Sequence, residues 1–150
     1  MATVQELDTA MQKNSVVTPL DVRLALMDYA DINIPLYQEF LTDEMLWKCI
    51  EWSVSNFNET PPVLHKKYTA ADFPKKKLLL DGAVVEALRL TALKELRGEM
   101  QYSDGGVQSS INYKFPQYNA LRQELEQKVA QETTATKRSL NINDCYGALC

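Results

Sequence analysis

Hydrophobic residues recur at helical spacing along most of the chain, and four stretches stand out. The first begins at Thr18 and Pro19. Threonine is a favourable N-cap, and proline suits the first helical position because its missing N–H has no partner there anyway. The apolar stripe of this helix is predicted to consist of Leu20, Leu24 and Met27, widened by Ala25 and Leu26. We expect the helix to end near Ala30.

A second helix is predicted to follow Thr42, which we assign as its N-cap, and to stop before Pro61 and Pro62. Its core face is predicted to consist of Leu46, Ile50, Val54 and Phe57. Trp47 and Trp52 lie off that stripe, so they cannot both point where the aliphatic residues point. We expect one tryptophan in the core and the other against a second element or another subunit.

The third stretch predicts the most buried helix, from Lys76 to Arg97, because apolar residues cover nearly its whole circumference. A helix of that kind must be surrounded by partners. Its small residues, which permit neighbours to approach closely, are Gly82, Ala83, Ala87 and Ala92. Gly98 then suits the C′ position, where a positive φ is needed.

A short polar stretch interrupts the helical pattern after this helix. Asp104-Gly105-Gly106 is a strong turn signal, and the flanking residues predict a small β-hairpin at about 100–113. An isolated hairpin is marginal in water. It could therefore project and offer an edge to another chain, or fold back on the bundle as a loop, and both alternatives stay open. The candidate interaction residues here are Tyr102, Ser103, Asp104, Gly105, Gly106, Val107 and Ile111.

The fourth helix is predicted from Pro116 to Lys137, with a narrow apolar stripe. That stripe consists of Leu121, Leu125 and Val129. Residues 139–150 hold too little apolar material to fold alone, so we expect an extended C-terminal arm there. Its candidate interaction residues are Leu140, Ile142, Cys145, Tyr146 and Leu149.

Together these elements predict a mainly α fold: a helical bundle around a buried central helix, with a small β-hairpin insertion and an extended C-terminal arm. Neither a repeat nor a long linker divides the chain. We therefore expect one bundle domain over residues 1–138, including the hairpin, and the arm over residues 139–150.

Composition and charge argue against broad nucleic-acid binding and against a membrane-spanning protein. The chain has 150 residues, enough for one domain with a real core, and 16 basic against 20 acidic residues give a net charge of -4. This charge argues against broad binding to nucleic-acid phosphates. No apolar run approaches the roughly 20 residues that span a bilayer, and the N-terminus lacks the pattern of a secretory signal. We expect a protein that folds in a cytoplasm and has no membrane partner.

The cysteines and the single histidine predict no metal or redox chemistry. Cys49 lies within a helical apolar pattern, which favours a buried free thiol. Cys145 and Cys150 have a wider spacing than zinc knuckles use, and only His65 could assist them. Two reduced thiols are therefore expected, without metal or disulfide.

No sequence motif of a nucleotide-binding loop, hydrolase or metalloprotease is present. Asp72 is expected to cap or turn the chain, and Asp81 to face solvent or pair with Lys77. The lysines at 66–67 and 75–77 are expected to be solvated, because no glycine-rich cradle accompanies them. We therefore expect no catalytic residues, no cofactor and no enzyme activity.

Residues from about 78 to 147 resemble a kind of small virion structural protein of tailed bacteriophages. The matching segments are Tyr102–Gly106, Val107–Ile111 and Ser139–Gly147. In those proteins an alanine-rich helix leads into a "YSDGG" or "YNDGG" turn, then a polar strand and a helix, and the chain ends on a segment like "SLNINDCYG". The N-terminal half carries no resemblance.

The resemblance implies a non-enzymatic subunit present in many copies per particle, in the neck or tail of the virion. Our preferred hypothesis is a head–tail connector, or neck adaptor, that forms a ring of identical subunits between the portal and other neck or tail proteins. DNA would pass through such a ring without sequence-specific binding. Two alternatives are a tail terminator or baseplate subunit, and a small regulatory protein that binds nucleic acid or another protein.

Overall fold

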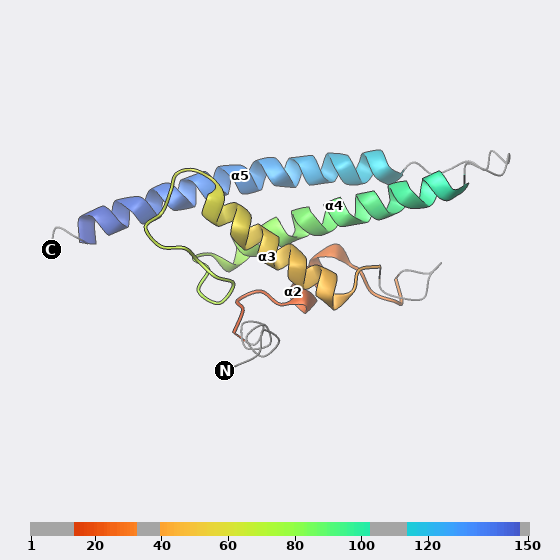
Figure 1. Ribbon diagram of the computed structural model, residues 1–150, viewed down its shortest axis with the longest axis horizontal. Helices are drawn as coiled ribbons and strands as arrows, with labels where there is room; N and C mark the ends of the chain where they lie inside the picture. Colours follow the sequence, from red (N-terminus) through yellow and green to blue (C-terminus); the bar gives the residue numbers. More distant parts are fainter. Residues whose placement is uncertain (1–13, 33–39, 103–113, 148–150) are drawn as a thin grey trace, which may run out of the picture.

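A computed structural model describes residues 14–32, 40–102 and 114–147. Its helices are α2 (Pro19–Leu26), α3 (Asp43–Glu59), α4 (Lys76–Tyr102) and α5 (Lys114–Gly147). The two long helices, α4 and α5, run antiparallel along the long axis, α3 crosses α4 obliquely, and α2 lies beside the first turns of α3 (Figure 1). The described part is therefore mainly helical and holds no strand.

Helix α4 is the central element, as its sequence predicts. It contacts α2, α3 and α5, and residues 82–88 are all buried. Gly82 permits close approach of α3, because a Cβ at this position would lie 2.1 Å from Ser53 Oγ. Ala83 and Ala87 are likewise completely buried. The small residues of α4 thus let two helices pack tightly against it.

Helix α4 extends further than predicted, through Gly98 to Tyr102. A glycine lowers helix propensity by only about 1 kcal/mol, and it is compatible with helical dihedral angles. The C′ role assigned to Gly98 and the first strand of the predicted hairpin, up to Tyr102, are therefore wrong. The turn and the second strand, residues 103–113, lie outside the described residues.

Helix α5 also extends further than predicted at both ends, from Lys114 to Gly147. Residues 139–147 are helical, so the prediction of an extended arm is wrong there, and the proposed boundary at residue 138 falls inside a helix. Tertiary contacts explain the difference, because Leu140 packs against the core and Asn141 Nδ2 donates to Val63 O at 3.3 Å. Within the predicted stripe, Leu125 and Val129 pack against the core but Leu121 is exposed.

The start of α2 is confirmed. Its predicted apolar face is wrong at Leu20, Leu24 and Met27, which are exposed, whereas Leu26 packs against the core. Thr18 caps the helix, and Asp21 completes a capping box with it. The helix ends at Leu26, four residues before the predicted Ala30, because Met27 adopts a left-handed conformation with φ 56°.

Leu20, Leu24 and Met27 are all exposed, and Leu20 is the most exposed of the three at 66%. Val22 and Arg23 are buried in their place. The helix turns these two residues inward because Arg23 has polar partners in the interior, and spacing among leucines cannot reveal such partners.

Helix α3 follows its prediction closely. Thr42 is the N-cap, and the helix ends at Glu59, just before Pro61 and Pro62. The predicted core face is buried at Leu46, Ile50 and Phe57 and half-buried at Val54. Cys49 is buried on the same side as a free thiol, as expected.

We expect Gly82→Leu to lower the free energy of unfolding by about 1–3 kcal/mol, because a leucine cannot fit where α3 and α4 cross. Urea unfolding followed by circular dichroism measures this. The matched control is Gln127→Leu, which places the same side chain at an exposed position of α5 and should change stability by no more than about 0.5 kcal/mol. Equal effects of the two substitutions would contradict the close crossing.

Candidate interaction surface

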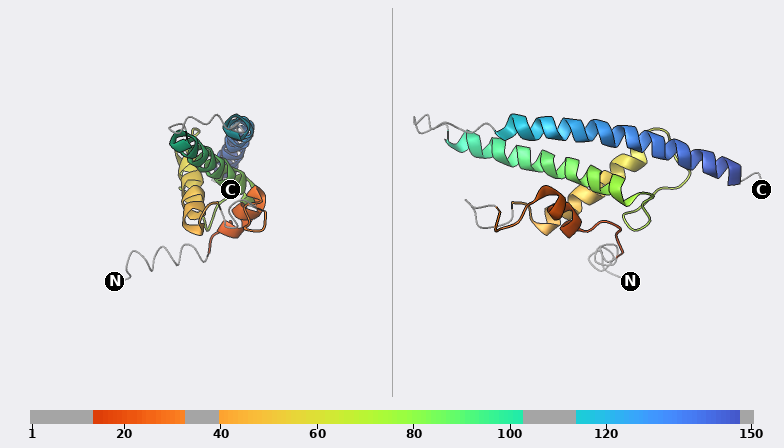
Figure 2. Two further views of the ribbon diagram at one scale, coloured as in Figure 1. Left: turned by 90° about the vertical axis from the view of Figure 1, so that its right-hand side faces the viewer. Right: turned by 180° about the vertical axis from the view of Figure 1, so that it is seen from behind.

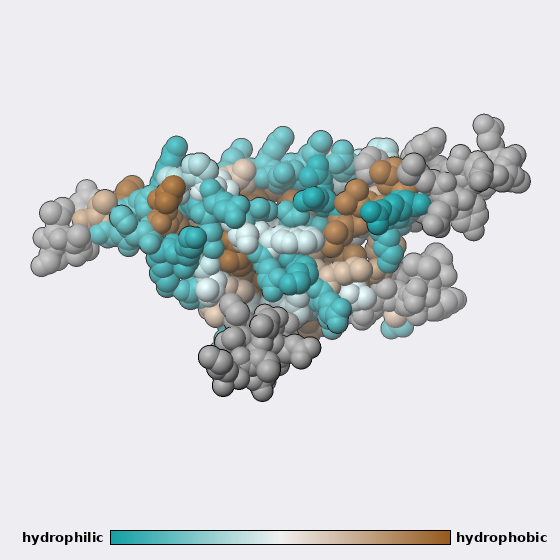
Figure 3. Space-filling view, in the orientation of Figure 1, coloured by the Kyte–Doolittle hydropathy of each residue, from teal (hydrophilic) through white to brown (hydrophobic). Residues whose placement is uncertain are grey.

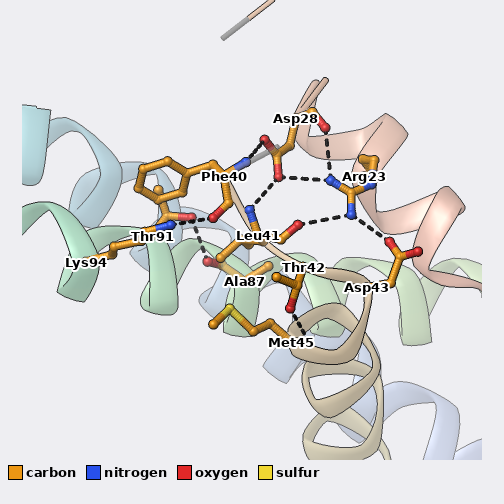
Figure 4. A network of polar contacts seen from close by, with 10 residues as sticks. All are labelled: Arg23, Asp28, Phe40, Leu41, Thr42, Asp43, Met45, Ala87, Thr91 and Lys94. Atoms are coloured by element: carbon orange, nitrogen blue, oxygen red, sulfur yellow. Dashed lines mark hydrogen bonds and ion pairs between the residues drawn. The ribbon is translucent and has the colours of Figure 1, made fainter. Parts of the chain in front are cut away.

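A polar cluster centred on the buried Arg23 and Asp28 joins α2 to the start of α3 (Figure 4). Arg23 donates to Leu41 O at 3.0 Å and to the Asp43 carboxylate at 2.6 Å, and it pairs with Asp28 at 3.4 Å. The Asp28 carboxylate accepts from the backbone N–H groups of Phe40 and Leu41 at 2.8 and 2.9 Å. Buried charges need this degree of pairing. We call these five residues the polar anchor, since they hold the two ends of the segment between Asp28 and Phe40 together.

Helix α4 is tied to the polar anchor through Lys94. Its Nζ donates to Phe40 O at 2.6 Å and lies 4.1 Å from the centre of the Phe40 ring. The second contact is a cation–π interaction, which adds to the hydrogen bond. Three helices, α2, α3 and α4, therefore meet at one polar centre (Figure 4).

A groove of about 1100 Å³ lies beside the polar anchor, between α3 and the C-terminal half of α4. We call it the tryptophan groove because both tryptophans line it. Its lining consists of Leu41, Asp43, Glu44, Met45, Trp47, Lys48, Glu51, Trp52, Leu90, Leu93, Lys94 and Arg97.

Apolar side chains in this groove are open to solvent. Trp52 is 43% exposed, and Met45 and Leu93 are exposed to a similar degree. Trp47 packs against the core, as expected for one of the two tryptophans. That Trp52 meets another subunit stays a prediction. An exposed apolar groove with a charged rim is typical of a binding surface.

A second exposed surface lies at the opposite end of the long axis, where α5 runs past the other helices (Figures 1 and 2). A shallow groove of about 490 Å³ separates the last turns of α5 from Pro61 and Pro62. Ile142 lines it and is 55% exposed. Figure 3 shows apolar side chains reaching the surface near this end of α5, while polar ones cover much of its outer face.

The end of α5 is held to the loop after α3 by a buried lysine. Lys137 is fully buried, its Nζ donates to Thr60 O, and it lies 4.9 Å from the centre of the Phe57 ring. No carboxylate of the described residues forms an ion pair with it. Burial therefore lowers the pKa of Lys137.

The structure places the predicted interaction residues in different environments. Tyr102 is the last residue of α4, and Ser103 to Ile111 lie outside the described residues. Of the C-terminal set, Leu140 packs against its own core, and Ile142 and Cys145 are exposed. Tyr146 lies in the last turn of α5, and Leu149 lies outside the described residues.

Reactive groups do not converge in the part of the chain that the structure describes. No three His, Cys, Asp or Glu side chains there are placed to hold a metal ion. Burial, with the nearby Glu86, raises the pKa of Cys49 to about 12, so its thiol stays protonated at neutral pH. His65 is exposed. No described helix is both long and apolar enough to cross a membrane.

The acids singled out in the sequence have structural partners. Asp72 accepts from Thr69 N and Oγ1 at 2.6 and 2.7 Å, which confirms its expected turn role. It also pairs with Lys66, and these hydrogen bonds hold the pKa of Asp72 well below its usual range. Asp81 pairs with Lys77 at 3.3 Å, as expected.

Sequence patterns missed the polar anchor and the burial of Lys137. Arg23 and Asp28 carry no motif, and their partners are mostly backbone atoms, which leave no trace in the sequence. Lys137 follows a polar, threonine-rich stretch that gives no hint of burial. The pair of tryptophans was the one available signal for the tryptophan groove.

No protein-family model, curated protein or solved structure matches this chain.

We expect Arg23→Met to destabilise the protein by about 3–5 kcal/mol, because it removes the guanidinium that pairs with the buried Asp28 carboxylate. The measurement is urea unfolding at neutral pH. Lys66→Met removes a cation from the exposed pair with Asp72 and should cost less than about 1 kcal/mol. A small effect of Arg23→Met would show that the polar anchor is dispensable.

We expect the stability of Lys137→Met, measured relative to the parent protein, to be highest at neutral pH and to fall as the pH rises toward 10.5. Because the pKa of Lys137 is lowered in the folded state, the unfolded chain binds more protons between that pKa and 10.5, so the parent protein gains stability with pH. Unfolding curves of both proteins at several pH values measure the difference. A difference that stays constant with pH would contradict the burial of a charged lysine.

Proposed function

We propose that this chain is a structural subunit of a tailed phage particle, in which it forms a head–tail connector (neck adaptor) ring. The ring would link the portal to the tail by protein–protein contacts. The resemblance at Tyr102–Gly106 and Ser139–Gly147 motivates the proposal. On this proposal the protein acts by assembly and carries out no catalysis.

One observation carries the proposal: two unlike exposed surfaces lie at opposite ends of one elongated subunit. The tryptophan groove lies near the end of α4, and Ile142 is exposed near the end of α5. Two different surfaces support head-to-tail contacts, which close into a ring when the rotation between subunits permits. A subunit with a single self-complementary patch would instead favour a two-fold dimer.

The shape of the subunit suits a connecting role. Helix α5 has 34 residues and so spans about 50 Å, with α4 packed along it. A rigid antiparallel pair of this length could reach from one ring of the particle to the next. The partners we propose are therefore other copies of the chain, the portal, and further neck or tail proteins.

The net charge of -4 is compatible with a ring through which DNA passes without sequence-specific binding. The rival hypothesis of a nucleic-acid-binding regulator depends on exposed lysines at 66–67 and 75–77. Three of these are paired with carboxylates: Lys66 with Asp72, Lys76 with Asp21, and Lys77 with Asp81. Pairing reduces their attraction to phosphate, so the structural role is favoured.

The location we propose is the virion neck, with assembly in the host cytoplasm. A tail terminator or baseplate subunit could use the same two surfaces, and location in the particle separates these possibilities. Antibody or gold labelling of purified particles should mark the junction of head and tail. Label at the far end of the tail would favour a baseplate subunit.

We expect the chain to be a monomer or small oligomer alone and a ring of fixed copy number in the particle. Light scattering of the purified protein and the mass of the complex released from particles measure this. Binding of duplex DNA to the purified protein, measured at two salt concentrations, tests the rival hypothesis of a nucleic-acid-binding regulator. Tight, salt-sensitive DNA binding, or absence of the chain from particles, would contradict the proposal.

A further inference from the structure

We infer that the tryptophan groove of one subunit receives the last turns of α5 from a second copy of the chain. This inference rests on the proposed ring and names the contact that would build it. The groove offers Met45, Trp52 and Leu93 as exposed apolar side chains. The end of α5 offers an exposed face on which Ile142 and Cys145 are three residues apart and therefore adjacent.

One wall of the groove, the one from α4, is opposite in charge to the end of α5, whereas the wall from α3 carries acidic side chains beside Lys48. The C-terminal end of a helix carries a partial negative charge, and Asp144 adds a carboxylate at the end of α5. The wall that α4 contributes to the groove carries Lys94 and Arg97. Neither Arg97 nor Asp144 has an ion-pair partner among the described residues. The negative end of α5 therefore suits the basic wall of the groove.

The arrangement of the helices makes this contact intermolecular. Helices α4 and α5 are antiparallel, so the last turns of α5 lie far from the C-terminal half of α4 in the same subunit (Figures 1 and 2). Each contact uses the groove of one copy and the α5 end of the next. One groove and one α5 end then stay free until the ring closes.

The polar anchor gives the groove a fixed shape before any partner arrives. Leu41, Asp43 and Lys94 line the groove and also take part in, or bind to, the anchor. A surface whose side chains are already held loses less conformational entropy on binding. The groove is therefore built for a helix end that is itself rigid.

Cross-linking two versions of the full chain, each with one exposed thiol, tests the contact. The first keeps Cys145 and carries Cys150→Ser, and the second carries Leu93→Cys with Cys145→Ser and Cys150→Ser. Cys49 is buried and stays unreactive. After mixing, and exposure to a short bis-maleimide, we expect mixed dimers to exceed dimers of either version alone at least about tenfold.

The bis-maleimide is added to the mixture at a protein concentration at which light scattering shows oligomers. If the isolated chain is a monomer, it is treated after assembly onto particles that lack the protein. The matched control replaces Leu93→Cys by Gln123→Cys, an exposed position on α5 outside the groove, and should give few mixed dimers. Oligomers that form without a link between Cys145 and the thiol introduced by Leu93→Cys would overturn this inference and leave the proposed ring standing. Absence of oligomers both in solution and in particles would overturn the ring as well.

Substitution gives a second readout. Trp52→Ala should weaken self-association at least about tenfold, since buried tryptophans are often the main energetic residues of an interface. Leu20→Ala, at an exposed leucine that does not line the groove, should leave self-association unchanged. Circular dichroism checks that both variants stay folded. Equal self-association of the two folded variants would contradict the contact.

Discussion

The structure depends on one constraint: the first half of α4, up to residue 88, is apolar on nearly every side and must be covered by the other helices. Helices α2, α3 and α5 all contact it, and residues 82–88 are buried without interruption. Covering a helix so completely requires close approach, which Gly82 and the neighbouring alanines permit. The arrangement of the other helices follows from this requirement, because each is placed by the part of α4 that it covers.

The polar anchor complements this apolar core. Arg23 and Asp28 are buried, and each is paired with the other and with backbone groups of the same stretch of chain. These contacts place Leu41 and Asp43 at one end of the tryptophan groove, and Lys94 joins them from α4. A buried ionic cluster is weak evidence for stability, but it defines geometry well. Here it determines the shape of the surface to which we assign a neighbouring subunit.

The end of α5 is helical instead of extended, but two of its candidate interaction residues are still exposed. The expected extended arm is helical through Gly147, yet Ile142 and Cys145 still face solvent. A helix presents these residues on a fixed face, whereas an arm would have to become ordered on binding and so lose more entropy. Rigid contact between preformed surfaces is consistent with a ring of identical subunits.

The sequence by itself determined the helical class, the N-caps Thr18 and Thr42, the core face of α3 and the central place of α4. These features depend on local periodicity and on side chains that satisfy neighbouring backbone groups. Only the tertiary structure decided that Val22 and Arg23 face inward on α2, that α4 passes through Gly98, and that 139–147 are helical. For Val22 and Arg23 and for residues 139–147, the deciding partners are distant in sequence. Helix α4 continues through Gly98 because a glycine inside a helix costs only about 1 kcal/mol.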